Sequence, residues 1–282
     1  MEGKVANRGL RRYAGVFGTF AHNSLVREMS FRANFIIEII SALSWMGMYL
    51  GFYILIFEYT PSIGAGADAW GKYEFFIFLG TTLFINSVVE AFFMPNTEEL
   101  SELIRTGGLD FALLKPIDTQ FLVSLQRVDW SSLANFLFAF TLVCYSFVQL
   151  GYAPSLVQIL LYVVYMGCGV GILYSLMITL SATSIWLGRN QTLYDFWFYI
   201  TNFSRYPMEI YSGPVGGWLR WGFTFVLPIL IVVNVPARML AKPLSPEYAY
   251  LALFALVATA ASLVASRWVF QRALLSYRSA SS

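Results

Sequence analysis

Residues able to do acid–base or nucleophilic chemistry are few in this chain. His22 is the only histidine, so neither a histidine-based metal site nor a catalytic triad can be assembled with a second one. Cys144 and Cys168 each fall inside an apolar stretch, where neither a disulfide nor a metal site is expected. We therefore predict no catalytic residues and no metal site, and the sequence argues against an intramembrane enzyme.

One segment comes close to a nucleotide-binding motif. The stretch GADAWGKY, Gly66–Tyr73, nearly matches the phosphate-binding pattern G-x-x-x-x-G-K-[ST]. Tyr73 replaces the residue whose hydroxyl would hold magnesium, and we expect no strand before the segment. We therefore predict no cofactor on this chain. If ATP powers the protein, ATP and its magnesium bind to a partner ATPase chain.

The most informative polar stretch is PNTEELSELIRTGGLDFALLKPIDTQ, Pro95–Gln120, which separates two long apolar runs. Asn96 or Thr97 can cap a helix, and the acidic residues that follow suit the positive end of its dipole. The Gly107-Gly108 pair should stop that helix. A second short helix should follow over Leu109–Leu114, so the stretch predicts helix, turn, helix.

Two short helices of this kind would form a compact docking surface for a soluble partner, with an exposed apolar set of Leu103, Ile104, Leu109, Leu113 and Leu114. The stretch is charged and punctuated by Gly and Pro, so it should lie in water between two membrane spans. We expect Leu103, Ile104 and Leu109 to pack into a groove of the partner. The full set of predicted docking residues is Glu98, Glu102, Leu103, Ile104, Arg105, Gly107, Leu109, Asp110, Lys115 and Pro116. The alternative is a solvated hairpin that only connects two spans.

The composition places these polar residues in an all-α integral membrane protein. The 282 residues are 58% hydrophobic and 12% charged, whereas soluble domains carry roughly 25% charged residues. A membrane-spanning helix needs about 20 mostly apolar residues. We treat 1–282 as one transmembrane domain with six predicted spans at about 34–57, 74–94, 131–151, 155–187, 191–210 and 248–270.

Basic residues predict the orientation of these spans, because Lys and Arg accumulate on the cytosolic side of membrane proteins. With the N-terminus inside, thirteen of the eighteen Lys and Arg residues fall on the inner side. The other five are Lys72, Arg205, Arg220, Arg238 and Lys242. Both termini and the segment 95–130 are therefore predicted to be cytosolic.

The first 32 residues are predicted to hold an amphipathic helix that lies along the inner membrane surface. Within 8–30, Phe17 and Phe20 can share an apolar side, while Arg11 and Arg12 can face anionic headgroups. The alternative is a basic tail that only sets the topology.

The region 207–246 holds six of the ten prolines. Within it, Phe223–Val235 is apolar for thirteen residues and is interrupted by Pro228, which is short for a span. We predict a re-entrant hairpin that dips from the outer face before the last span. The competing interpretation makes 217–240 the fifth span and lays 191–212 on the inner surface.

Two carboxylates fall within predicted spans. A charge at this depth is costly and should face protein or water, so Glu38 and Glu90 could line a transport path or bind a cationic substrate. They could equally be groups near the membrane interface, neutral or paired.

Two motifs resemble a known family. The sequence LIRTGGLDFALLKPI looks like the cytosolic loop of permease subunits of the type-2 ABC exporters, in the subgroup of short six-span permeases. The sequence SRYPMEIYSGP followed by FVLPILIVVNVPARML, Ser204–Leu240, is similar to the Pro-rich re-entrant region that precedes the last span in that family. The basic amphipathic N-terminus is also similar, and the resemblance covers nearly the whole chain in order.

The resemblance implies a set of partners. Two such permeases, identical or paralogous, pair in the bilayer of a prokaryotic plasma membrane, and two separate ABC ATPase subunits bind beneath them. The cytosolic loop, here about Glu98–Lys115, acts as a coupling helix seated in an ATPase groove. Nucleic acid is not an expected partner, because the net charge is only +2.

The sequence therefore predicts the membrane-spanning subunit of an ATP-driven exporter, which is not an enzyme by itself. The alternative is a secondary transporter or channel, which would need internal symmetry or a dense polar pathway, and the sequence displays neither. Hydrophobic drugs, cationic compounds, glycolipids and polysaccharide are all compatible cargoes.

Overall fold

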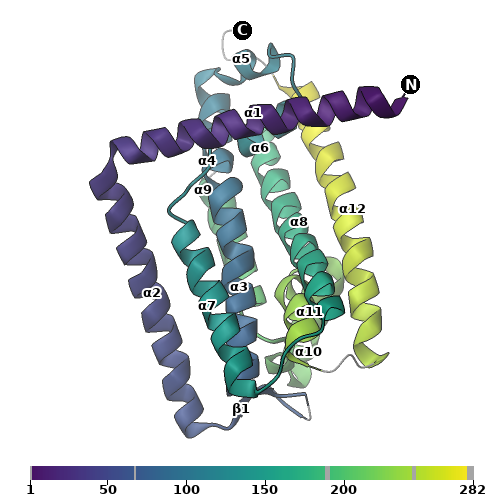
Figure 1. The fold of residues 1–282 in the computed structure, drawn as a ribbon. Coiled ribbons are helices and arrows are strands. Elements are labelled where there is room, and N and C mark those ends of the chain that lie inside the picture. The colour runs from purple at the N-terminus through teal and green to yellow at the C-terminus, as the bar shows by residue number, and fades with distance from the viewer. Residues whose placement is uncertain (1, 67, 188–190, 243–245, 278–282) are drawn as a thin grey trace.

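The chain folds into a bundle of helices with one long helix lying across its end (Figure 1). The computed structural model describes all residues except 1, 67, 188–190, 243–245 and 278–282. Helix α1, Glu2–Ser30, crosses this end, and α2, Arg32–Tyr59, runs from it along the edge of the bundle. A two-stranded antiparallel ribbon of β1 (Ser62–Ile63) and β2 (Trp70–Gly71) lies at the opposite end. We call these the α1 end and the ribbon end.

The other helices run between these ends or cap them. The first group is α3 (Lys72–Phe92), α4 (Met94–Thr106), α5 (Leu109–Leu113), α6 (Thr119–Leu125), α7 (Leu133–Leu150) and α8 (Leu156–Leu187). The second group is α9 (Gln191–Asn202), η1 (Phe203–Arg205), η2 (Met208–Ile210), α10 (Gly213–Trp221), η3 (Gly222–Val226), α11 (Leu230–Ala241) and α12 (Pro246–Ser276). Helices α4, α5 and α6 gather at the α1 end, whereas α10 lies toward the ribbon end (Figure 1).

Four helices in the described part of the chain are long and apolar enough to cross a membrane: α2, α3, α8 and α12. The segments α10–η3 and α11 form a pair bent by 90°, which would add a fifth if it counted as one span. The predicted span 131–151 corresponds to α7, which is apolar but shorter. The predicted span 191–210 corresponds to α9, which has 12 residues and is followed directly by the short 3-10 helix η1. The membrane class is thus confirmed, and the count of six stays a prediction.

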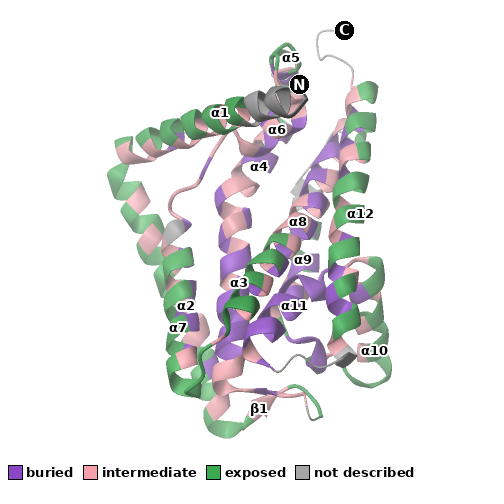
Figure 2. Cartoon of the chain, turned by 45° about the vertical axis from the view of Figure 1, so that its right-hand side comes forward, coloured by how far each residue is buried: buried purple, intermediate pink, exposed green. Residues whose placement is uncertain are grey.

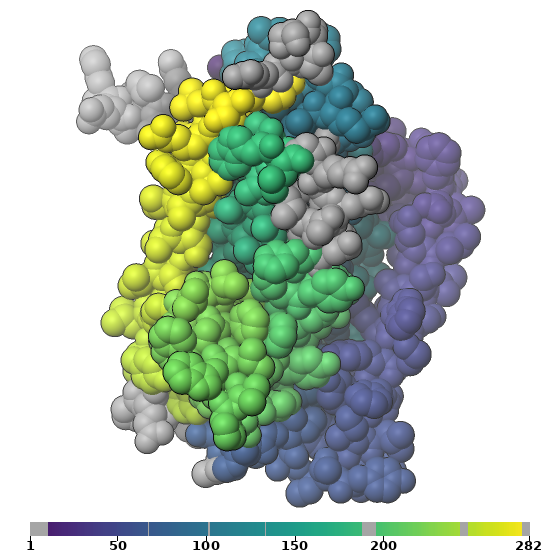
Figure 3. Space-filling view, turned by 180° about the vertical axis from the view of Figure 1, so that it is seen from behind, coloured from purple at the N-terminus to yellow at the C-terminus, as the bar shows by residue number. Residues whose placement is uncertain are grey.

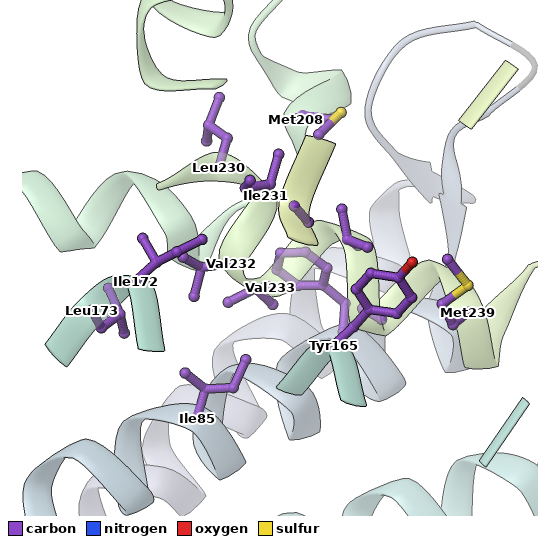
Figure 4. Close-up of a cluster of buried hydrophobic side chains, with 14 of the residues drawn as sticks. Ile85, Tyr165, Ile172, Leu173, Met208, Leu230, Ile231, Val232, Val233 and Met239 are labelled. Carbon is purple, nitrogen blue, oxygen red and sulfur yellow. The ribbon is translucent and has the colours of Figure 1, made fainter. Parts of the chain in front are cut away.

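Close helix packing forms the centre of the bundle. A side chain at Gly169 of α8 would lie 2.6 Å from the carbonyl oxygen of Val232 in α11, and one at Gly171 would lie 3.1 Å from Thr259 in α12. Glycine lets these backbones approach, as small residues do between membrane helices. Around this contact, side chains of α3, α8 and α11 interdigitate, with Tyr165 of α8 beside the α11 valines (Figure 4).

The helices differ sharply in how far the bundle buries them. In the most apolar stretch of α3, 72% of the residues are buried within the chain, whereas in that of α2 only 6% are. Figure 2 displays the same contrast between the buried centre and the exposed α2 at the edge. The α2 helix therefore offers almost its whole apolar surface to lipid or to another chain.

The helix predicted over 8–30 is present as part of α1, and its two sides differ as expected. Arg11 and Arg12 are exposed, whereas Phe17 and Phe20 are partly buried. The Phe17 ring lies 6.0 Å from the ring of Phe92 in α3, and Phe20 packs against the buried cluster beneath α4 and α5. The apolar side of α1 thus packs on its own chain.

The Pro-rich region 207–246, of which 243–245 lie outside the described residues, turns sharply at its middle. The turn separates α10–η3 from α11, and the α10–η3 segment forms a broad surface beside α12 at the ribbon end (Figure 3). The loop before β2 contacts both ends of the region. The backbone N–H of Ala65 donates to Glu209 at 3.3 Å, and the Lys242 ammonium donates to the carbonyl of Asp68 at 2.6 Å. Both ends of the region therefore contact the ribbon end, and the re-entrant hairpin stays a prediction.

A group of charged and polar side chains around a buried ion pair, which we call the clasp, holds this region to the ribbon end. Its members are Asp68, Trp70, Glu209, Arg238 and Lys242. The Arg238 guanidinium donates to Glu209 and to Asp68, both at 2.6 Å, and its side chain is only 9% exposed. Glu209, at 3% exposure, also accepts a hydrogen bond of 2.8 Å from the Trp70 indole. The clasp therefore ties the loop before β2, η2 and α11 together.

Replacing Arg238 by Met should destabilise the protein by about 3–5 kcal/mol, because it strands the buried Glu209 carboxylate without its cation. Thermal unfolding in a mild detergent measures the effect. Adding Glu209→Gln should recover part of the loss, because the stranded charge is then removed. Lys72→Met, on the same end but outside the clasp, is the control. An Arg238→Met protein as stable as this control would contradict the role of the clasp.

The hairpin interpretation predicts that Ala65 and Ser212, both exposed, lie on the same side of the membrane. In a chain whose two cysteines are replaced by serine, Ala65→Cys and Ser212→Cys should both react with an impermeant maleimide added to intact cells. Lys115→Cys should react only after permeabilisation. Protection of Ser212→Cys together with Lys115→Cys would favour 217–240 as the fifth span.

Candidate functional site

The predicted docking segment forms α4, α5 and α6 at the α1 end. The first helix begins earlier than expected, at Met94, directly after a break at Phe93. Neither predicted cap acts as one: the Asn96 amide donates to the carbonyl of Phe92 at 2.7 Å, and the Thr97 hydroxyl donates to that of Phe93 at 2.9 Å. The capping prediction was wrong because α4 follows α3 almost without interruption, so these side chains bond to the preceding turn.

Asn96 has a second partner that fixes the base of the segment. Its amide also donates to the carbonyl of Arg127 at 2.7 Å, and its own oxygen accepts from the Arg127 backbone N–H at 2.8 Å. One buried carboxamide thus satisfies both backbone groups of a residue that lies beyond α6, as buried polar groups require. The start of α4 and the end of α6 are held together.

The predicted helix stop at Gly107 is confirmed. Gly107 ends α4 with φ of 74°, the left-handed conformation that favours glycine at the C-terminus of a helix. At Gly108, an added Cβ would lie 2.8 Å from the Cδ2 atom of Leu103, so a side chain there would require the end of Leu103 to move. The second helix is α5, which has five residues, and Asp118 then caps α6 by accepting from the backbone N–H of Phe121 at 2.9 Å.

The turn folds one face of α5 inward. Leu109 is fully buried and packs with Leu100 of α4 and Leu122 of α6, against α8 and α12. Leu103 and Ile104 are partly buried against the same cluster. The expectation that Leu109 enters a partner's groove was therefore wrong, because its place is in the chain's own core. Leu109 thus anchors α5 to the rest of the chain.

The exposed face of α5 carries the apolar surface instead. Phe111 is 73% exposed, Leu114 is 81% exposed and Leu113 is 40% exposed. We call these three residues the α5 patch, and they lie at the extreme α1 end of the molecule (Figure 2). The exposure of Leu113 and Leu114 was expected. Phe111 was not among the predicted docking residues, although its position two residues after the buried Leu109 places it on a different side of a helix.

Charged side chains flank the α5 patch. The Arg105 guanidinium donates to Glu102 at 2.8 and 2.5 Å, one turn along the exposed side of α4. The hydrogen bond from Arg105 lowers the pKa of Glu102, so this carboxylate stays ionised. Glu98, Lys115 and Pro116 are exposed as well, whereas Asp110 is half-buried. An apolar patch with a charged rim is typical of protein–protein contacts.

Helix α1 braces the segment from the other side. The Trp130 indole donates to the carbonyl of Ala21 at 3.0 Å, and the backbone N–H of Trp130 donates to the Glu28 carboxylate at 3.1 Å. The Ser24 hydroxyl accepts from the backbone N–H of Val128 at 3.1 Å. The stretch that joins α6 to α7 is therefore hydrogen-bonded to α1.

The two carboxylates predicted to lie in spans have separate surroundings. Glu38 is exposed on α2 and accepts a hydrogen bond of 2.6 Å from Asn34 of the same helix. Glu90 of α3 is half-buried and faces Asn135 of α7, whose amide lies 3.5 Å from its carboxylate.

The segment resembling a phosphate-binding loop is built into the ribbon end. A two-residue strand, β1, does precede it, so that expectation was wrong, but β1 pairs with β2 inside the motif itself. Asp68 and Trp70 of the motif belong to the clasp. Among the described residues, no group of three or more His, Cys, Asp or Glu side chains is placed to hold a metal ion.

Comparison with protein families gives one match. The family described as ABC-2 family transporter protein matches residues 43–281, which is most of the chain. Comparisons with curated proteins and with solved structures gave no match.

The burial of Leu109 gives a direct test of the site's construction. Leu109→Ala should cost about 2–5 kcal/mol of stability, because it opens a cavity in a packed cluster. Phe111→Ala, two residues away, should change stability by less than about 0.5 kcal/mol, because Phe111 is exposed. Thermal unfolding of the two variants in one detergent makes the comparison. Equal melting temperatures would show that α5 does not pack as described.

Proposed function

This chain belongs to the ABC-2 family of transporter membrane proteins, and from that premise we propose that it is the membrane-spanning subunit of an ATP-driven exporter. It is a multi-pass membrane protein. ATP and magnesium would bind on separate ATPase subunits, and this chain would supply the substrate path and the mechanical coupling. Its termini and the α1 end would face the cytosol of a prokaryotic cell.

The observation that carries this proposal is the α5 patch on its braced support. A soluble subunit could cover the exposed Phe111 and Leu114, while Arg105 and Lys115 at the rim fix its orientation. Burying two such side chains would supply several kcal/mol of apolar contact, at about 1.5–3 kcal/mol each. We propose that each of two ATPase subunits seats the 98–115 segment of one permease.

The rigidity of the support explains how ATPase movement would reach the membrane. The Asn96–Arg127 hydrogen bonds fix the base of the segment, and α4 follows α3 after a single break at Phe93. A rigid element that joins two spans can convert the closure of a partner into helix movement. The packed cluster around Leu109 would keep α5 in place when the ATPase subunit moves.

The exposed α2 supports the presence of a second permease. Only 6% of the residues in the most apolar stretch of α2 are buried within the chain. This helix therefore has room for lipid on one side and another membrane chain on the other. We propose that the substrate path forms between two permeases, with Glu90 and Asn135 among its polar groups. Glu38, in the second turn of α2, fits a position near the headgroups.

Co-purification tests the coupling surface. The double variant Phe111→Asp/Leu114→Asp should reduce the amount of co-purified ATPase subunit by about tenfold or more, because each carboxylate would have to enter an apolar groove. Ala65→Asp, an exposed change at the ribbon end, is the matched control. The ATPase is identified by mass spectrometry and by ATP hydrolysis. If the double variant retains the ATPase as the control does, the segment is only a connector.

A charge swap tests the rim separately. Glu102→Arg combined with Arg105→Glu keeps the pair within α4 but reverses the charges presented outward. It should weaken ATPase binding without changing the melting temperature, because complementary charges guide docking. Unchanged ATPase binding would exclude Arg105 from the contact and leave only the apolar patch.

A further inference from the structure

A cavity of about 400 Å³ lies between α6, α8 and α12, near the α1 end. Its wall is divided by polarity. Asp118, Gln120, Ser124, Tyr174 and Arg267 form the polar part, and Phe121 and Leu263 form part of the apolar wall. The cavity is open to the outside, since the side chains of Arg267 and Asp118 are 42% and 34% exposed.

The polar part of the wall is held in place by its own hydrogen bonds. The Arg267 guanidinium donates to both oxygens of Asp118, at 3.0 and 2.5 Å, and to Gln120 at 2.9 Å. The Gln120 amide donates to the Tyr174 hydroxyl at 2.9 Å. One cation and one anion therefore stand side by side, fixed in position and half exposed.

This ion pair retains capacity for a ligand. A guanidinium carries five N–H donors, and the bonds to Asp118 and Gln120 use three of them. The Oδ2 atom of Asp118 accepts from Arg267, and Oδ1 accepts from Arg267 and from the backbone N–H of Phe121. Burial raises the pKa of Asp118, but the hydrogen bonds from Arg267 and the Phe121 backbone outweigh it and lower the pKa overall. Asp118 therefore stays ionised at neutral pH.

The position of the cavity matches the depth of lipid headgroups. Arg267 lies in the last third of α12, and α1 runs beside the cavity, where the Tyr13 ring meets Phe121 with centroids 4.8 Å apart. Val264 and Trp268 of α12 are 71% and 59% exposed, so the surface beside Arg267 is apolar. A Trp next to a basic residue near the end of a membrane helix is typical of the interface.

We propose that this cavity binds the phosphoethanolamine headgroup of a membrane phospholipid. The phosphate takes the remaining donors of Arg267, since a guanidinium suits phosphate geometry. The ammonium lies against Asp118, and an acyl chain runs along Leu263 and the exposed apolar side of α12. A zwitterion matches a site that pairs one positive with one negative charge. The bound lipid joins α6 of the docking segment to α12.

Native mass spectrometry of the purified full chain in mild detergent tests this assignment, with phosphatidylethanolamine, phosphatidylcholine and phosphatidylglycerol added in turn. The wild type should bind phosphatidylethanolamine about tenfold more tightly than the other two, because choline has no N–H donors and glycerol carries no charge for Asp118. Asp118→Asn should abolish this preference. Arg267→Gln should weaken binding of all three lipids about tenfold.

Two further variants separate recognition from folding. Leu263→Trp narrows the mouth of the cavity while leaving the ion pair intact, so it should lose the lipid even if Arg267→Gln proves unstable. Arg272→Gln, on the same helix over the Trp268 ring, should bind as the wild type does. Equal affinity of the wild type for the three lipids, or unchanged binding by Leu263→Trp, would overturn the proposal.

The same experiment with O-phosphoethanolamine tests whether the ligand is a soluble headgroup instead of a lipid. If O-phosphoethanolamine binds as tightly as the lipid, the ligand is the free headgroup and the lipid assignment is wrong. These measurements use the chain without any ATPase. Their failure would therefore leave the coupling proposal untouched, and failure of the coupling proposal would leave the lipid site untouched.

Discussion

The Arg238–Glu209 pair sets the constraint on which the architecture rests. Two charges that are 9% and 3% exposed stand 2.6 Å apart in a chain made mostly of apolar residues. Such a pair is tolerable only when its remaining hydrogen-bonding groups are also satisfied, and Asp68 and Trp70 satisfy them. That requirement brings the loop before β2 against η2 and α11. It thereby positions the α11 backbone for its contact with Gly169 of α8.

At the α1 end the corresponding partners are mostly neutral. Asn96 satisfies the backbone of Arg127 and Ser24 satisfies that of Val128, whereas the partly buried Glu28 carboxylate accepts from the backbone N–H of Trp130. The two ends therefore differ in chemistry. The ribbon end is closed by a buried ion pair, whereas the charged side chains named at the α1 end platform are exposed or only partly buried. A platform of this kind suits a surface that must be approached from outside.

Much of this could be predicted from the sequence, because long apolar runs and Gly or Pro stops act locally. The positions of α2, α3, α7, α8 and α12 and the turn at Gly107 followed from such signals. The inward face of α5 did not, because five residues are too few to reveal a helical period. The role of Asn96 depends on a partner 31 residues away. The clasp joins residues 170 apart, and no spacing in the sequence indicates it.

The thin contact between α2 and the bundle has a consequence for the membrane itself. Because neighbouring helices of this chain cover so little of α2, lipid tails or a second membrane chain must complete its packing, and the bilayer directly affects the subunit's structure. The tilt of such a helix responds to hydrocarbon thickness at a cost of only fractions of a kcal/mol per Å. Since α2 joins α1 at Phe31, a change in thickness would be felt at the platform. The lipid composition of the membrane would then influence the tilt of α2 and, through it, the position of α1.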